Sequence, residues 1–268
     1  MAHGSHNKTP QDTALLTVPG WVRLLPGLVH GFSAGLPRED ESAPERQARA
    51  LVERVLGSPA PAPVLMSQPH GRDLADLGNG HAPRNGNGAV IPGVDGVHST
   101  LRAGHVLFVK SADCVPVLAV HPERGAYAAL HAGWRGVAAG ILPNLLESWR
   151  RAGFDPRGVM LALGPHIRAC CFEVREDCIA RFAPEDLEGA LQRKQGQAVI
   201  SLEATLRAQA GRHGVPPENI TTLPLCTTCH QERTGEHLFA SHRRALANGA
   251  PGAGRNLSFI GTRTQRRG

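Results

Sequence analysis

Three short segments of the chain carry side chains that can bind a metal ion, each beside a glycine or a proline. They are Ser67-Gln-Pro-His-Gly71, Ser111-Ala-Asp-Cys-Val-Pro116 and Leu130-His-Ala-Gly-Trp-Arg-Gly136. Each contributes one such side chain: His70, Cys114 and His131. We expect these three residues at strand edges, where the backbone is rigid and a side chain can be exposed.

The chemistry of this set suits an open zinc site. Two imidazole nitrogens and one thiolate are good zinc ligands, and a fourth position stays free for water or substrate, as in catalytic zinc sites. A water bound there loses a proton near neutral pH. Because thiolate also suits copper, ligand type alone does not name the metal.

The same residues allow other interpretations. A lone cysteine in an apolar strand is more often part of the core, and a lone histidine beside glycine is more often structural. Cys114 and His131 also have the residue types of a nucleophile and its general base, as in cysteine hydrolases. Spacing alone does not separate these alternatives.

Two neighbouring residues are candidates for supporting roles. Arg135 lies near the expected start of a helix, where backbone N–H groups also favour anions, so it suits a phosphate or a transition state. A solvated surface arginine is the alternative. Asp113 suits either a carboxylate that orients a metal ligand or a buried turn carboxylate.

The other cysteines are Cys170, Cys171, Cys178, Cys226 and Cys229. In a chain without an export signal, we expect thiols or metal ligands rather than disulfides. The adjacent Cys170 and Cys171 predict two buried thiols.

The segment Cys226-Thr-Thr-Cys-His230 has the form of a haem attachment site, but haem attachment requires export. A structural zinc held by Cys226 and Cys229 needs further ligands, such as His237 or His242, and their spacing is irregular. Reduced thiols near the site are the default expectation.

Short apolar runs with β-branched residues must position these groups. Strands are expected over residues 105–110, 115–120, 126–130 and 159–163. Helices are expected over residues 43–56, 137–152 and 201–212. Ser201 caps the last of these helices. Pro143 removes a hydrogen bond from the second, which implies a kink or a late start.

The mixture of strands and helices without strict alternation favours an α+β sandwich over a doubly wound parallel sheet. With no repeat or domain boundary in view, we expect one domain over residues 21–268, behind a disordered leader over residues 1–20. Residues 78–93 hold five glycines and two prolines, which predicts a long loop that serves function.

Composition excludes several classes of protein. The 268 residues are 41% hydrophobic but only 4% aromatic, so the core must be mostly alanine, valine and leucine. The net charge of +6 comes from scattered arginines without interleaved aromatic side chains, which disfavours nucleic-acid binding and leaves phosphate-bearing substrates. No apolar run approaches a membrane span, and the polar N-terminus is unlike a signal peptide, so we expect a cytoplasmic protein.

Longer motifs carry a family resemblance. The chain resembles the laccase-domain family, also called multicopper polyphenol oxidase or purine nucleoside phosphorylase, over residues 29–262. The motifs, in order, are Asp95-Gly-Val-His-Ser-Thr100, Ala112-Asp-Cys-Val-Pro-Val117, His131-Ala-Gly-Trp-Arg-Gly136, Gly164-Pro-His-Ile-Arg-Ala-Cys-Cys-Phe-Glu-Val174, Cys226-Thr-Thr-Cys229, Phe239-Ala-Ser-His-Arg-Arg244 and Gly254-Arg255.

The resemblance implies an α/β/β/α sandwich and a single zinc ion held by His70, Cys114 and His131. It implies purine nucleosides and phosphate as substrates: family members phosphorolyse adenosine, inosine, guanosine and methylthioadenosine, and they deaminate adenosine. We expect the zinc to activate water for deamination, and Arg135 to assist phosphate. The oligomeric state stays open, with a monomer among the options.

Two other activities are alternatives. Some members of the family are linked to removing misincorporated residues from peptidoglycan precursors, so an editing amidase is one alternative. A copper polyphenol oxidase is the other, but its copper cluster needs His-x-His pairs, and this chain has 14 histidines and no such pair.

The sequence departs from the family pattern at a few positions: Pro69, Arg168, Ala169, Phe172 and His242. None of these departures removes a metal ligand. They therefore bear on substrate preference more than on the chemistry.

Overall fold

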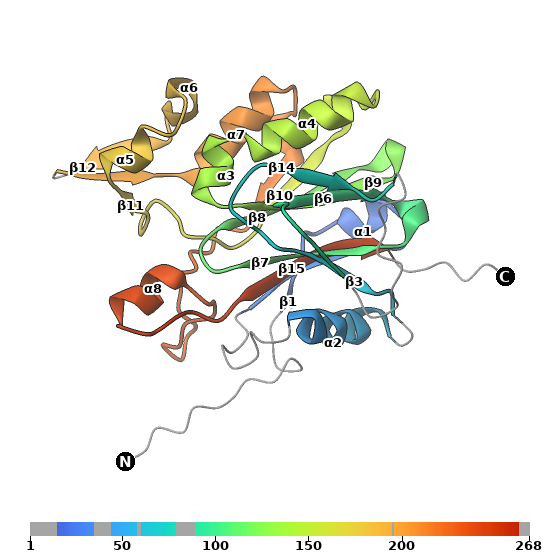
Figure 1. The fold of residues 1–268 in the computed structure, drawn as a ribbon, viewed down its shortest axis with the longest axis horizontal. Coiled ribbons are helices and arrows are strands. Elements are labelled where there is room, and N and C mark those ends of the chain that lie inside the picture. The colour runs from blue at the N-terminus through green and yellow to red at the C-terminus, as the bar shows by residue number, and fades with distance from the viewer. Residues whose placement is uncertain (1–14, 35–43, 58–59, 79–88, 195, 263–268) are drawn as a thin grey trace, which may run out of the picture.

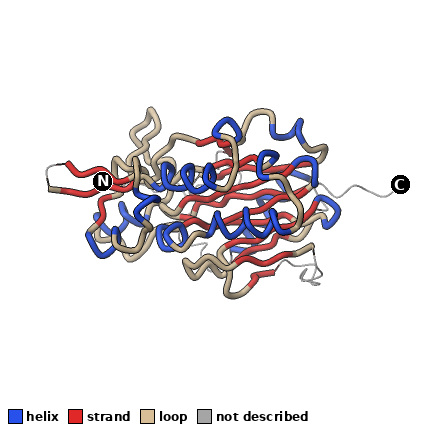
Figure 2. Tube along the Cα trace, turned by 90° about the horizontal axis from the view of Figure 1, so that it is seen from above, coloured by secondary structure: helices blue, strands red, loops and turns tan. Residues whose placement is uncertain are grey.

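The computed structural model describes residues 15–34, 44–57, 60–78, 89–194 and 196–262. Two six-stranded sheets stack face to face, and helices cover both outer faces (Figure 1). Helix α2 (Pro44–Leu56) covers one sheet, whereas α3 (Trp134–Ala138), α4 (Ile141–Arg151) and α7 (Leu202–Arg212) cover the other. The expected single-domain α/β/β/α sandwich is thus the observed architecture, and the strands run lengthwise through it (Figure 2).

The first sheet contains both chain ends of the described fold. Its strand order is β1-β2-β15-β7-β3-β5, in which β3 runs parallel to both β7 and β5 while the other pairs are antiparallel. The bounds are β1 Leu15–Leu16, β2 Leu28–Ser33, β3 Pro63–Met66, β5 Ala89–Ile91, β7 Val106–Ser111 and β15 Asn256–Thr262.

The second sheet has the order β14-β10-β8-β9-β6-β4. Strands β8 and β9 form an antiparallel hairpin, and β10 pairs in parallel with β14 at the edge. The bounds are β4 Leu74–Asp76, β6 Gly96–Thr100, β8 Val115–His121, β9 Ala126–Ala132, β10 Met160–Leu163 and β14 Ile220–Thr222. A small third sheet joins β11 (Glu173–Val174), β13 (Gln197–Ile200) and β12 (Leu191–Lys194).

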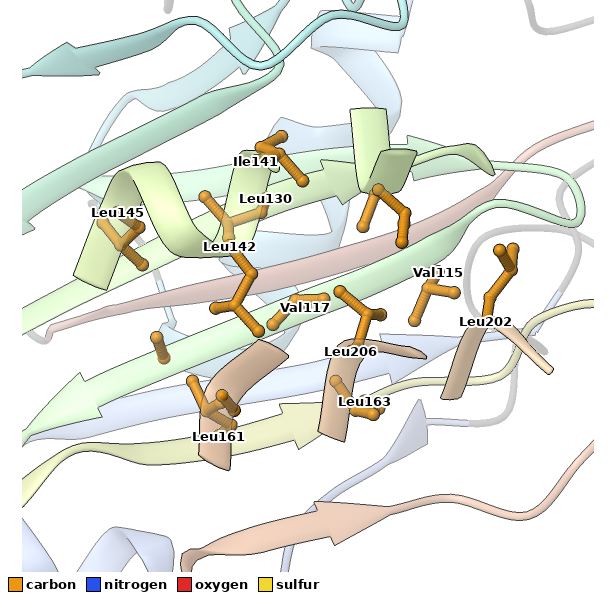
Figure 3. Close-up of a cluster of buried hydrophobic side chains, with 14 of the residues drawn as sticks. Val115, Val117, Leu130, Ile141, Leu142, Leu145, Leu161, Leu163, Leu202 and Leu206 are labelled. Carbon is orange, nitrogen blue, oxygen red and sulfur yellow. The ribbon is translucent and has the colours of Figure 1, made fainter. Parts of the chain in front are cut away.

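The side chains of a central strand alternate between the two faces of the sheet and so contribute to two separate hydrophobic cores. In β8, Val115 and Val117 pack beneath α4 and α7 (Figure 3), while Leu118 and Val120 pack between the two sheets. All four side chains are fully buried. Successive side chains of a strand point to opposite faces, so a strand between two layers reads as a continuous apolar run.

The segment predicted as one helix over residues 137–152 is two helices. Helix α3 ends at Ala138, and Gly140 turns the chain with a φ of 83° before α4 begins. Pro143 is the third residue of α4, where no intrahelical partner exists for a backbone N–H, so it costs no hydrogen bond. The late start suggested by Pro143 is confirmed, and the continuous helix is wrong.

The other predicted elements agree to within a few residues. Ser201 caps α7 as expected, its hydroxyl accepting a hydrogen bond from the Ala204 amide. Of the expected leader, residues 1–14 lie outside the described residues, but Leu15–Leu16 pair with β2 and Val18 is buried, so this stretch belongs to the fold. The expected loop over 78–93 falls mostly outside the described residues, and its last part contains β5. Within the described ranges, no helix has the length and apolarity to cross a bilayer.

Candidate metal centre

The fold brings His70, Cys114 and His131 together. One potential ligand atom from each residue lies within 4.8 Å of the other two. His70 follows β3 of the first sheet, Cys114 immediately precedes β8, and His131 lies in β9 of the second sheet. The β8–β9 register pairs Pro116 with His131, which sets the Cys114 turn beside the histidine. The centre therefore joins the ends of strands from both sheets.

A buried carboxylate orients two of the three residues. Asp95 is completely buried, and its Oδ1 accepts a hydrogen bond of 2.8 Å from Nδ1 of His131. The backbone amides of His70 and Gly71 donate to the same carboxylate at 3.0 and 2.6 Å. Nε2 of His131 is the nitrogen left to face the centre. A histidine ligand that donates its other N–H to a carboxylate is the usual arrangement in metal sites.

Sequence analysis missed this role of Asp95 and gave the orienting role as one of two alternatives for Asp113. The carboxylate of Asp113 instead accepts from the Thr227 hydroxyl at 2.7 Å and from the Arg243 amide at 2.7 Å. Asp113 is therefore the buried turn carboxylate of the two alternatives. One feature of the sequence could have indicated Asp95: it is an acidic residue that directly precedes β6, a strand of the second sheet.

The backbone at the centre is unusual. Gln68, His70 and Asp113 are the non-glycine residues with positive φ in the described ranges, at 62°, 68° and 89°. Such conformations cost about 1–3 kcal/mol each and persist where the surroundings impose them, as at functional sites. Gly133 adds space: a Cβ on it would lie 3.0 Å from the Cys114 sulfur and 3.1 Å from the His70 ring.

The charges of the centre favour a thiolate. Burial by itself raises the pKa of Cys114, but hydrogen bonds and charge from His131 and His70 lower it to about 6. Burial by itself lowers the pKa of His131, but its hydrogen bonds to Asp95 and Cys114 raise it to about 9. Thiolate is the metal-binding form of cysteine, and a metal ion bound here would displace the proton that His131 holds.

Donor type, convergence and the buried carboxylate behind His131 together fit a metal ion bound by three protein ligands. The two imidazole rings meet edge to face with centroids 4.8 Å apart. His70 is exposed, whereas His131 is buried, so the centre opens on the His70 side. A three-residue set that opens to solvent leaves a position for water or substrate.

The centre lies in a cleft of about 560 Å³. Arg135 lines the cleft, as do three more cationic side chains, Lys110, Arg243 and Arg255. Arg135 is the second residue of α3, and its guanidinium lies 4.3 Å from the centroid of the Trp134 ring. The apolar part of the cleft wall comes from Trp134, Ile167, Phe172, Leu202 and Leu246.

Comparison with known proteins shows the family to which the chain belongs. The profile of the family described as "Multi-copper polyphenol oxidoreductase laccase" matches residues 25–263. The chain belongs to this laccase family. Its relatives in the family include proteins named as enzymes of purine nucleosides.

One such relative is "Purine nucleoside phosphorylase YlmD" of Geobacillus stearothermophilus, which is 33% identical over 87% of this chain and 84% of its own length. Another is "Adenosine deaminase RL5" from an unknown prokaryotic organism, 34% identical over 60% of this chain and 61% of its own length. The crystal structure of YlmD superposes with a TM-score of 0.73 and 28% identity over 90% of this chain and 93% of that one. Bacillus licheniformis YfiH, at 24% identity and a TM-score of 0.77 over 93% of this chain and 96% of that one, shares the fold.

Proposed function

We propose that this member of the laccase family is a zinc-dependent purine nucleoside phosphorylase that also cleaves methylthioadenosine and deaminates adenosine. The observation that carries the proposal is an open set of three metal-binding side chains in a cationic cleft. The names of the relatives agree with it, because they include both phosphorylases and a deaminase.

His70, Cys114 and His131 would hold the zinc ion, with the fourth position directed into the cleft. When bound, the ion supplies Lewis acidity and lowers the pKa of a coordinated water to about 7. Asp95 keeps His131 in the tautomer that presents Nε2 to the centre. Zinc agrees with this ligand set better than a laccase-type copper cluster, which uses many more histidines.

The cleft has an apolar part, which suits the purine base of a nucleoside, and a cationic part, which suits a phosphate ion. The apolar side chains of Trp134 and Phe172 offer surfaces for a flat purine base. Arg135 offers a cation for phosphate, and its position over the Trp134 ring holds the guanidinium at the cleft wall. In phosphorolysis, a phosphate oxygen bonds to C1′ of the ribose while the C1′–N9 bond breaks. The bonding pair leaves with N9, which takes up a proton, and the products are purine and ribose 1-phosphate.

A second candidate function follows from the same atoms. Cys114 contacts His131, and His131 contacts Asp95, as a nucleophile, its base and an orienting carboxylate do in a catalytic triad. This arrangement suits a cysteine amidase such as a cell-wall editing enzyme. The position of His70 favours the metal interpretation, because a nucleophile needs one imidazole and here two converge on the thiol.

Product analysis separates the two functions. The protein is incubated with adenosine, with and without phosphate, and the products are resolved by chromatography. We expect adenine and ribose 1-phosphate only when phosphate is present, and inosine with ammonia in both cases. If adenosine stays intact under both conditions while the protein contains stoichiometric zinc, the nucleoside proposal is wrong.

A further inference from the structure

A second group of sulfur atoms converges away from His70, Cys114 and His131. The Sγ atoms of Cys170, Cys171, Cys226 and Cys229 all lie within 4.8 Å of one another. Those of Cys170 and Cys229 are 3.7 Å apart, too far for a disulfide, and all four residues are free thiols. Cys226 is buried, while Cys170 and Cys229 are exposed and Cys171 is half-buried, so the expectation of two buried thiols at 170–171 is wrong.

The topology of the second sheet brings the four sulfur atoms together. Strands β10 and β14 are parallel neighbours, so the turns that follow them emerge at the same edge. The turn after β10 carries Cys170 and Cys171, and the segment after β14 carries the other two cysteines. The two segments are fastened by a bridge between His166 and Cys226, with hydrogen bonds from the His166 amide to Leu225 O and from the Thr227 amide to His166 O. The positions of the sulfur atoms are therefore set by the sheet.

The spacing of the sulfur atoms fits a tetrahedral ion. With zinc–sulfur bonds of about 2.3 Å, the sulfur atoms of a four-thiolate site lie about 3.8 Å apart. The 3.7 Å between Cys170 and Cys229 matches this edge.

We propose that Cys170, Cys171, Cys226 and Cys229 bind a second zinc ion, at a closed structural site distinct from the open centre in the cleft. Four thiolates fill a tetrahedral coordination sphere and leave no position for substrate, which is the rule for structural zinc. The sequence offered His237 or His242 as the further ligands that Cys226 and Cys229 need, and in this proposal Cys170 and Cys171 take that place.

The proposed ion stabilises two segments that contact residues of the cleft wall. Thr227 and Thr228, between the two cysteines of the second segment, both donate hydrogen bonds to Asp113, the neighbour of Cys114. On the other segment, the carbonyl of Cys171 accepts from the guanidinium of Arg243 at 3.1 Å. Fixing the four sulfur atoms therefore fixes both segments that hold the Cys114 turn and the Arg243 side of the cleft.

Zinc counting in a variant that lacks the open centre tests this proposal. The His131→Ala protein, purified with zinc present and passed through a desalting column, should retain one zinc per chain by elemental analysis. Adding Cys226→Ser should remove it, whereas adding Cys178→Ser, a cysteine outside the cluster on α5 (Glu176–Ile179), should leave it in place. Cys229→Ser, at an exposed position, repeats the test where Cys226→Ser fails to fold.

Cobalt gives an independent readout. The His131→Ala protein loaded with Co²⁺ should show the intense sulfur-to-metal charge-transfer and visible bands of a tetrahedral thiolate site, and these should disappear with Cys229→Ser. A His131→Ala protein that folds and retains no zinc overturns the proposal. So does a count of four titratable thiols in the denatured, metal-stripped protein, because two of the six cysteines would then be joined in a disulfide. Neither result depends on which substrate the cleft accepts.

Discussion

Nδ1 of His131 donates a hydrogen bond of 2.8 Å to a carboxylate, Asp95, that is completely shielded from solvent. The same carboxylate accepts from the backbone of His70, so one buried side chain positions residues from both sheets. This relationship explains how two histidines that are 61 positions apart hold a fixed geometry around one thiol. It also makes Asp95 the residue whose loss should disturb the centre without removing a ligand.

Asp95→Asn should weaken metal binding by about 10–100-fold, because the imidazole loses the charged partner that orients it. The affinity is measured by competition with a chromophoric chelator. Asp177→Asn, on exposed α5, is the matched control and should leave the affinity unchanged. Equal affinities for the wild type and Asp95→Asn would show that the carboxylate has no part in the centre.

Gly133→Ala should impair the centre by crowding. The new Cβ would press on both the Cys114 sulfur and the His70 ring, which are near neighbours of the proposed ion. We expect at least a tenfold loss of metal affinity with little change in thermal stability. Gly211→Ala is the control, because it lies in α7 with open space around it and should stabilise the helix by about 1 kcal/mol. Unchanged metal affinity in Gly133→Ala would contradict the geometry of the site.

Cys114 should react as a thiolate in protein stripped of metal. Because the neighbouring imidazoles lower its pKa to about 6, alkylation by iodoacetamide should rise to a plateau with a midpoint near pH 6. An ordinary cysteine has its midpoint near pH 8.5. Mass spectrometry of the Cys114 peptide gives the rate, and bound metal should suppress it. A midpoint above pH 8 in the stripped protein would rule out the thiolate form described here.

Acid should destabilise the fold through His30. This histidine is buried in β2 and accepts a hydrogen bond from the Val18 amide, and burial lowers its pKa from 6.5 to about 4. The unfolded chain therefore binds a proton between pH 6.5 and 4 that the folded chain does not, so stability is present above pH 6.5 and is lost as pH falls towards 4. The contribution between pH 7 and 5 is about 2 kcal/mol.

Urea unfolding at pH 7 and pH 5 measures this loss. His30→Gln cannot take up a proton, so the decrease in unfolding free energy between the two pH values should be smaller in this variant by about 2 kcal/mol. Equal pH dependence in the two proteins would show that His30 is not the group responsible.

The central strands were predictable because the pattern that defines each one lies within its own short segment of sequence. Each of β7, β8, β9 and β10 is a short apolar run bounded by turn residues, which is sufficient to place it. The break between α3 and α4 was harder to see because it depends on the positive φ of Gly140, and glycine inside an apolar helical pattern leaves the choice open.

The candidate site was accessible in part for a similar reason. His70, Cys114 and His131 carry chemistry that is visible in their residue types, and the family motifs select them. Asp95 was missed because its partners lie 25 and 36 positions away, and nothing in its own segment indicates them. The cysteine cluster also depends on strand pairing, since Cys170 and Cys229 meet only because β10 lies beside β14.

The most direct test of the account is the phosphate-dependent release of adenine from adenosine by His131→Ala, measured beside the wild type and a His213→Ala control. His213 directly follows α7 and is not among the residues that line the cleft. We predict that the wild type and the control release adenine at the same rate, and that His131→Ala loses activity together with the zinc ion of the open centre. Adenine release by His131→Ala at the wild-type rate would contradict the account.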